Sequence, residues 1–122
     1  MTGVAPQIDP RELASALAAA IMRSRATHST TVERCGVEVR QCRYDSGLIE
    51  VAVCTPEIIP GAGKIPRAVV TGAQGKRNWV VHARTERAWI GRSKRRALEF
   101  AVGEAIAMDG EVRKKFESGT PL

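Results

Sequence analysis

The sequence predicts an α+β fold, in which an N-terminal helix, an antiparallel sheet of four or five strands and a C-terminal helix pack together. Apolar residues recur at helical spacing towards both ends of the chain and at every second position between them. With 122 residues, the chain is long enough to bury a core without metal or disulfide crosslinks. We therefore expect residues 1–122 to form a single domain, with flexible tails at 1–8 and 117–122.

Both predicted helices begin at capping residues. Asp9 precedes Pro10 and can cap a first helix that ends near residues 23–25. Ser93 can cap a second helix, which we expect to end at Asp109-Gly110, with residues 111–116 as a possible further turn of helix. The apolar positions are Leu13, Leu17, Ala20 and Ile21 in the first helix and Ala97, Leu98, Ala101, Val102, Ala105 and Ile106 in the second.

Between the helices, alternation and turn residues predict a series of short strands. A hairpin pairs residues 36–44 with 48–54 around Asp45-Ser46-Gly47. Prolines and glycines between 56 and 66 predict an irregular loop, and shorter strands follow at 68–71, 79–84 and 88–90.

Several classes of protein are disfavoured by composition. The longest apolar run, residues 13–22, is too short to cross a bilayer, and the chain starts without the pattern of a signal peptide. The cysteine spacing fits no zinc site, and no catalytic constellation stands out. We therefore expect a cytoplasmic protein of a prokaryote, a phage or a mobile element, which is not an enzyme and has no metal, cofactor or membrane contact.

Positive charge is concentrated in one segment. Ten bases and a single acid, Glu86, lie between positions 64 and 96, so that this segment carries a formal charge of +9 and the rest of the chain −3. Such a block costs self-repulsion, and arginine, which predominates here, suits planar contacts with phosphate or carboxylate. The bases are Lys64, Arg67, Lys76, Arg77, Arg84, Arg87, Arg92, Lys94, Arg95 and Arg96.

Two short motifs in this region suggest phosphate binding, and one of them fails. Gly61-Ala62-Gly63-Lys64 resembles part of a phosphate loop, but Ile65-Pro66 follows in place of Ser or Thr and a helix, so that no row of amides is expected. The other motif is the predicted helix start, where Lys94, Arg95 and Arg96 occupy a first turn that normally favours acids. An anion held by the helix amides and these side chains would resolve that conflict.

The run from Gly91 to Ile106 resembles the last strand-to-helix junction of double-stranded-RNA-binding domains. In that family a Gly-x-Ser and several bases open the final helix, and an Ala-rich stripe packs it on an antiparallel sheet. The resemblance implies that Lys94 and Arg95 contact phosphates and that Ala97, Ala101 and Ala105 are packing residues. Leu98 stands where the family has a further lysine, and the family's Gly-Pro-x-His loop is absent.

The order of strand, turn, strand and basic helix also resembles the arm-binding domains of phage integrases and the related AP2 fold. There the strands enter the major groove of DNA, which implies that Arg77, Arg84 and Arg87 read the duplex and that Trp79 or Trp89 packs or contacts a base.

The sequence thus predicts a small nucleic-acid-binding protein, with an adaptor or inhibitor that places the same face on an acidic protein as the alternative. DNA and RNA both remain open, and a homodimer through an exposed sheet edge is compatible with either function. The expected nucleic-acid contacts are Lys76, Arg77, Arg84, Arg87, Arg92, Ser93, Lys94, Arg95 and Arg96.

Overall fold

A computed structural model of the chain describes residues 9–85 and 87–119. The expected N-terminal tail, Glu86 and the last three residues lie outside the described part. The elements in chain order are α1 (Pro10–Arg23), β1 (Ser29–Arg34), β2 (Val37–Arg43), β3 (Leu48–Thr55), β4 (Ile65–Ala73), β5 (Trp79–Ala83), β6 (Ala88–Gly91) and α2 (Lys94–Glu117).

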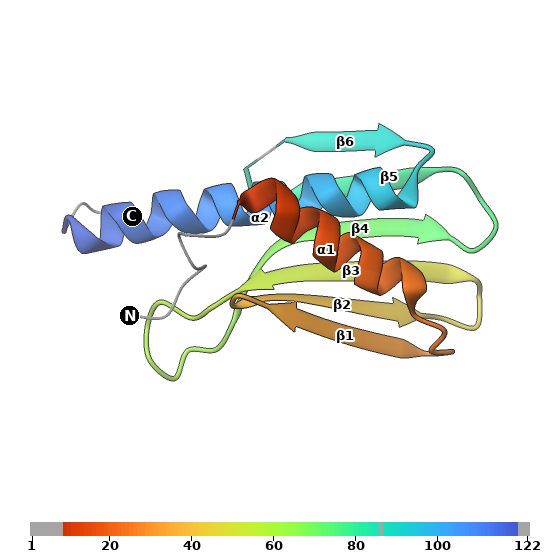
Figure 1. The fold of residues 1–122 in the computed structure, drawn as a ribbon, viewed down its shortest axis with the longest axis horizontal. Helices are drawn as coiled ribbons and strands as arrows, with labels where there is room; N and C mark the ends of the chain where they lie inside the picture. The colour runs from red at the N-terminus through yellow and green to blue at the C-terminus, as the bar shows by residue number, and fades with distance from the viewer. Residues whose placement is uncertain (1–8, 86, 120–122) are drawn as a thin grey trace.

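The six strands form one antiparallel sheet whose spatial order is the chain order, β1-β2-β3-β4-β5-β6. Both helices lie on the same face of this sheet, with α1 over the β1–β2 side and α2 over β3 to β6 (Figure 1). They also pack against each other. The predicted α+β arrangement, with its N-terminal and C-terminal helices, is therefore confirmed.

Period-two burial of β2 and β3 builds the core under the helices. Val39 pairs with Val53 and Val51 pairs with Val70, and all four side chains are buried on the helix-covered face. Alternate residues of the same strands point to the opposite face, which no described helix covers.

The helix starts follow the predicted caps. The Asp9 carboxylate accepts a hydrogen bond from the Arg11 amide at 2.9 Å, and the Ser93 hydroxyl accepts one from the Arg96 amide at 3.2 Å. Each cap satisfies an amide that has no partner within the helix, and so fixes where the helix begins.

The sequence predicted four or five strands, whereas the sheet has six, and the strand that was missed is the edge strand β1. Along most of β1, exposed side chains alternate with half-buried ones. Val32 is its one apolar side chain that packs on the core. Its turn to β2 is made by Cys35 and Gly36, with φ of 54° and 87°. Both central residues of a tight hairpin turn need positive φ, but cysteine rarely supplies it, so the turn was not recognisable.

Two boundaries also differ from the prediction. Asp109-Gly110 does not end α2, because Asp109 is buried and Arg113, one turn later, donates to its carboxylate at 2.9 Å. Ile65 and Pro66, expected in the loop, begin β4 opposite Thr55 and Cys54, next to an irregularity in the register of β3.

Two glycines provide a test of this packing. A Cβ at Gly72 would lie 2.3 Å from the Trp79 ring, whereas a Cβ at Gly103 would meet no atom within 4 Å. Gly72→Ala should therefore lower the free energy of unfolding by about 1–3 kcal/mol through overpacking. Gly103→Ala should raise it by about 0.5–1 kcal/mol, since alanine favours the helix. Urea denaturation of both variants measures the two effects, and a similar change in both would contradict the packing around Trp79.

Candidate nucleic-acid interface

Four connections meet at one end of the molecule, because successive strands of the sheet run in opposite directions. They are residues 23–28 after α1, the β2–β3 turn, the β4–β5 turn and the β6–α2 junction, all at the right of Figure 1. The Gln74 amide donates to the Gly47 carbonyl at 2.9 Å and joins the two turns directly.

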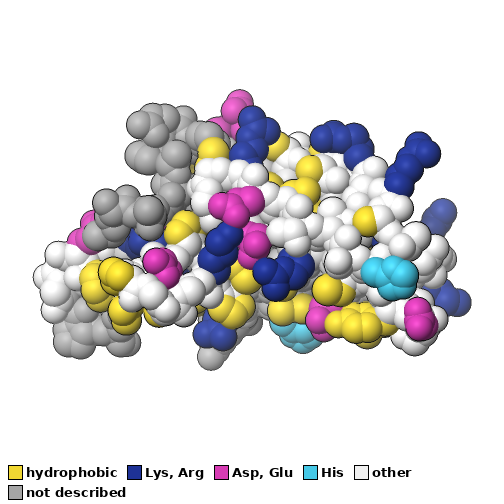
Figure 2. Space-filling model, turned by 90° about the horizontal axis from the view of Figure 1, so that it is seen from below, with side chains coloured by type: hydrophobic (Ala, Val, Ile, Leu, Met, Phe, Trp, Pro, Cys, Tyr) yellow, Lys and Arg dark blue, Asp and Glu magenta, His cyan; other side chains and the backbone are white. Residues whose placement is uncertain are grey.

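These four segments, residues 23–28, 43–47, 74–78 and 91–96, contain nine bases and one acid, Asp45. We call this surface the basic end. Figure 2, seen from the β1 side, shows Lys and Arg side chains protruding at this end of the molecule. Its bases are Arg23, Arg25, Arg43, Lys76, Arg77, Arg92, Lys94, Arg95 and Arg96.

The three bases in the first turn of α2 point in different directions. Lys94 reaches inwards, where its ammonium donates to Gln41 at 2.5 Å and lies 5.4 Å from the centre of the Trp79 ring. Arg95 lies along the helices and donates to Ser15 of α1 at 3.2 Å. The sequence had suggested that these side chains converge on one anion, but Lys94 and Arg95 point to different partners.

The inward position of Lys94 changes its chemistry. Gln41 is 1% exposed and Trp79 is 5% exposed, so the Lys94 ammonium is held among buried groups. Burial, and secondarily the charge of Arg43, lowers the pKa of Lys94 from 10.5 to about 8. Lys94 therefore serves mainly to join the start of α2 to the sheet.

The most available bases around the start of α2 are Arg92, just before the Ser93 cap, and Arg96 in the first turn. Both are exposed, and within the described residues neither forms an ion pair, whereas Arg95 lies 3.6 Å from Glu99. No acid lies in the first turn of α2. Arg92 and Arg96 therefore leave their charge free for an external anion.

A second group of bases at this end was missed by sequence reasoning. Arg25 and Arg43 line a hollow of about 260 Å³ together with Ala26, Thr27 and Gln74. The Nε atom of Arg43 is buried there without a hydrogen-bond partner among the described groups. The three separate connections that form this hollow are far apart in the sequence, so only the order of the strands could have revealed it.

Arg84 and Arg87, which the sequence grouped with the other bases, lie at the opposite end of the sheet, in the β5–β6 turn. Arg87 is 2.8 Å from Glu104 and 5.6 Å from the centre of the Phe100 ring. Lys64 pairs with Glu33 and Glu38, and Arg67 is buried. The basic segment of the sequence is thus divided between two ends of the fold.

The glycine-rich loop does gather amides, contrary to the sequence-based expectation. The Gly61 and Gly63 amides donate to the Glu57 carboxylate at 3.1 and 3.0 Å. This loop, whose two glycines have φ of 83° and 86°, therefore holds an anion of the chain itself.

The two tryptophans are packing residues. Trp79 belongs to the buried core, and Trp89 is partly buried and packs against that core. The exposed aromatic side chain in the described part of the basic end is Tyr44, next to Arg43.

Disulfides, metal-binding groups and membrane-spanning helices are the other features relevant to a functional site. Cys35, Cys42 and Cys54 are free thiols. No group of three His, Cys, Asp or Glu side chains in the described part could hold a metal ion. Neither described helix has the length and apolarity needed to cross a membrane.

Comparison with protein-family models, curated proteins and solved structures gave no match for this chain. The resemblances of residues 76–106 to double-stranded-RNA-binding and arm-binding domains therefore stay predictions.

The buried ammonium predicts a pH dependence of stability. The pKa of Lys94 in the folded protein, about 8, lies below its ordinary value of 10.5, so the unfolded chain binds more protons between these pH values. The contribution of Lys94 to the free energy of unfolding should thus rise with pH across this window, by on the order of 1–2 kcal/mol after allowance for solvent screening, and it is measured as the difference between the wild type and Lys94→Met. Urea denaturation at pH 7.5 and pH 10.5 measures the rise.

Lys94→Met should remove this rise, and the exposed Lys76→Met should keep it. Parallel pH profiles for the wild type and Lys94→Met would show that the ammonium is not held in a buried site.

Proposed function

We propose that the protein is a small nucleic-acid-binding protein that contacts phosphates through the basic end. The observation that supports this most is the gathering of nine bases and one acid from four separate segments onto one end of the sheet. Within the described residues, only Arg95 among these bases forms an ion pair with an acid.

The residues in the first turn of α2 give a second argument for phosphate binding, because the start of a helix normally favours acids. Arg96 is the third residue of α2, the position at which Glu would complete a capping box with Ser93. Folding alone therefore favours an acid where the chain has a base. A phosphate near Arg92 and Arg96 would offset the repulsion between these cations and the positive end of the helix.

Contacts of this kind make binding strongly dependent on salt and weakly dependent on sequence. Each phosphate neutralised by a base releases counterions from the nucleic acid, so that affinity falls steeply with ionic strength. The alternative partner is an acidic protein surface, which would meet the same bases.

The test is a charge reversal that should not harm the fold. Arg92→Glu with Arg96→Glu should lower affinity for a 20-base-pair duplex by about ten- to a hundredfold and reduce the salt dependence by about two phosphate contacts. Thermal stability should be unchanged or higher, because Glu at position 96 favours the helix start. Fluorescence polarisation with duplex DNA, single-stranded DNA and duplex RNA at low salt measures binding.

Lys114→Glu with Lys115→Glu is the matched control, since both lysines are exposed in the C-terminal half of α2 and the charge change is the same. Equal losses in the two variants would mean that net charge alone drives binding. If the wild type binds none of the three probes, the nucleic-acid function is wrong. Capture of an acidic protein from nuclease-treated lysate that is lost in the Arg92/Arg96 variant would then favour the alternative.

A further inference from the structure

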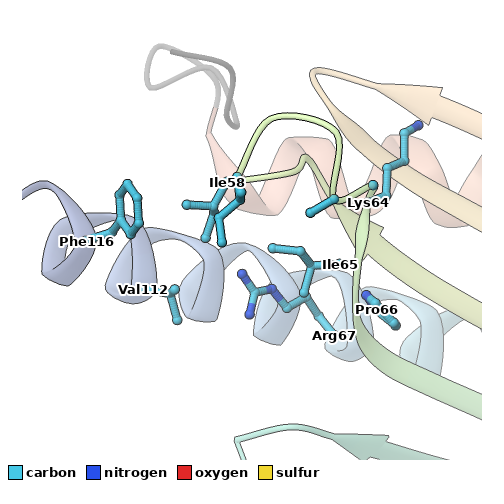
Figure 3. A pocket seen from close by; sticks show the side chains of 10 residues that line it. Ile58, Lys64, Ile65, Pro66, Arg67, Val112 and Phe116 are labelled. Atoms are coloured by element: carbon cyan, nitrogen blue, oxygen red, sulfur yellow. The ribbon is translucent and has the colours of Figure 1, made fainter. Parts of the chain in front are cut away.

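At the end of the sheet opposite the basic end, a hollow of about 350 Å³ lies between the β3–β4 loop and the C-terminal half of α2. Figure 3 shows Ile58, Ile65, Val112 and Phe116 around it, with the Arg67 guanidinium extending between Ile65 and Val112. The volume is in the lower part of the range, roughly 300–1,000 Å³, that holds small molecules.

Arg67 is an unusual group at such an apolar wall. It is only 6% exposed, and its Nη2 atom is buried without a hydrogen-bond acceptor among the described groups. Its Nε donates to the Thr55 hydroxyl at 3.0 Å, which fixes the orientation of the guanidinium plane. An unsatisfied buried donor of a charged group is costly, so the protein itself does not fully satisfy this guanidinium, which lines the hollow.

The charges around Arg67 do not cancel. Asp109 is 3.8 Å from Arg67 Nη2, but both of its oxygens already accept from Arg113 Nε, at 2.9 and 3.1 Å. The three buried side chains Arg67, Asp109 and Arg113 therefore carry a net charge of +1, and Arg84 adds a further positive charge near Arg67. A negatively charged group that enters the hollow would therefore be attracted to this cluster.

The walls of the hollow are held in place independently of any ligand. Arg113 donates to the Pro56 and Glu57 carbonyls at 2.7 and 3.1 Å, and the Glu57 carboxylate binds the Gly61 and Gly63 amides. The loop is thereby tied to α2 at its start and closed on itself at its tip. A ligand would find the site formed before it binds.

We propose that this hollow binds a small monocarboxylate with an apolar body, whose carboxylate pairs with Arg67 and whose apolar part contacts Ile58, Ile65, Val112 and Phe116. The site is separate from the basic end and does not depend on nucleic-acid binding. A carboxylate suits this site because it is planar and can pair with the guanidinium through charge-assisted hydrogen bonds.

Titration calorimetry of the full chain with octanoate tests the proposal. Octanoate should bind with a dissociation constant below 1 mM, about tenfold or more tighter than octanol, octylammonium or acetate, each of which lacks one of the two required parts. Equal binding of octanoate and octanol, or no binding of octanoate at millimolar concentration, would overturn the proposal.

Two variants locate the site. Arg67→Met should weaken octanoate binding at least tenfold, and it leaves the Asp109–Arg113 pair neutral so that the fold is retained. Ile59→Glu places an acid at the rim, where Ile59 is 61% exposed, and should weaken binding by repulsion. Ile90→Glu, at a side chain 76% exposed on β6, is the matched control and should bind as the wild type does. Wild-type affinity in both pocket variants would place the ligand elsewhere.

Discussion

The connection of the six strands by hairpins in chain order decides where the other features of the molecule lie. Because each strand runs opposite to its neighbours, consecutive connections fall at alternate ends of the sheet. Connections distant in sequence, such as the segment after α1 and the start of α2, therefore meet at the basic end. The β3–β4 loop and the β5–β6 turn fall at the other end with the C-terminal half of α2. The two candidate sites are consequently separated by the length of the sheet.

Burial along α2 is the second constraint, and it explains the charged residues that lie inside the protein. The apolar stripe occupies positions 97, 98, 101, 102 and 105. Steps of about one helical turn extend the same stripe back to Lys94 and forward to Asp109 and Arg113. Each of these charged side chains meets a partner at the sheet or on the helix: Gln41 for Lys94, and each other for Asp109 and Arg113. The inward turn of Lys94 and the length of α2 thus have the same cause.

Local signals explain which parts of the fold could be predicted from the sequence. Asp9 and Ser93 cap helices through their own side chains, and the Asp45-Ser46-Gly47 turn lies between two alternating strands, so these elements were found correctly. β1 was missed because Val32 is the one apolar side chain of this edge strand that packs on the core, so the strand has no alternation of apolar and polar residues. The helical break expected at Asp109-Gly110 is absent because Asp109 is buried and pairs with Arg113 one turn later, while Arg113 is held by the Pro56 and Glu57 carbonyls, which are distant in sequence. The basic residues were recognised as a group, but their division between two ends depends on the strand order.

Arg96 is the residue at which local stability and the proposed function conflict most clearly. The Ser93 cap is formed, so the chain has kept the element that starts the helix. It lacks an acid in the first turn, although an acid there would improve both the cap and the interaction with the helix dipole. Lys94 adds little outward charge, because it is turned towards Gln41 and Trp79. The outward positive charge at this corner therefore comes mainly from Arg92, Arg96 and the helix amides, with Arg95 shared with Glu99, so the proposed phosphate contact would be made by the groups that the fold leaves unpaired.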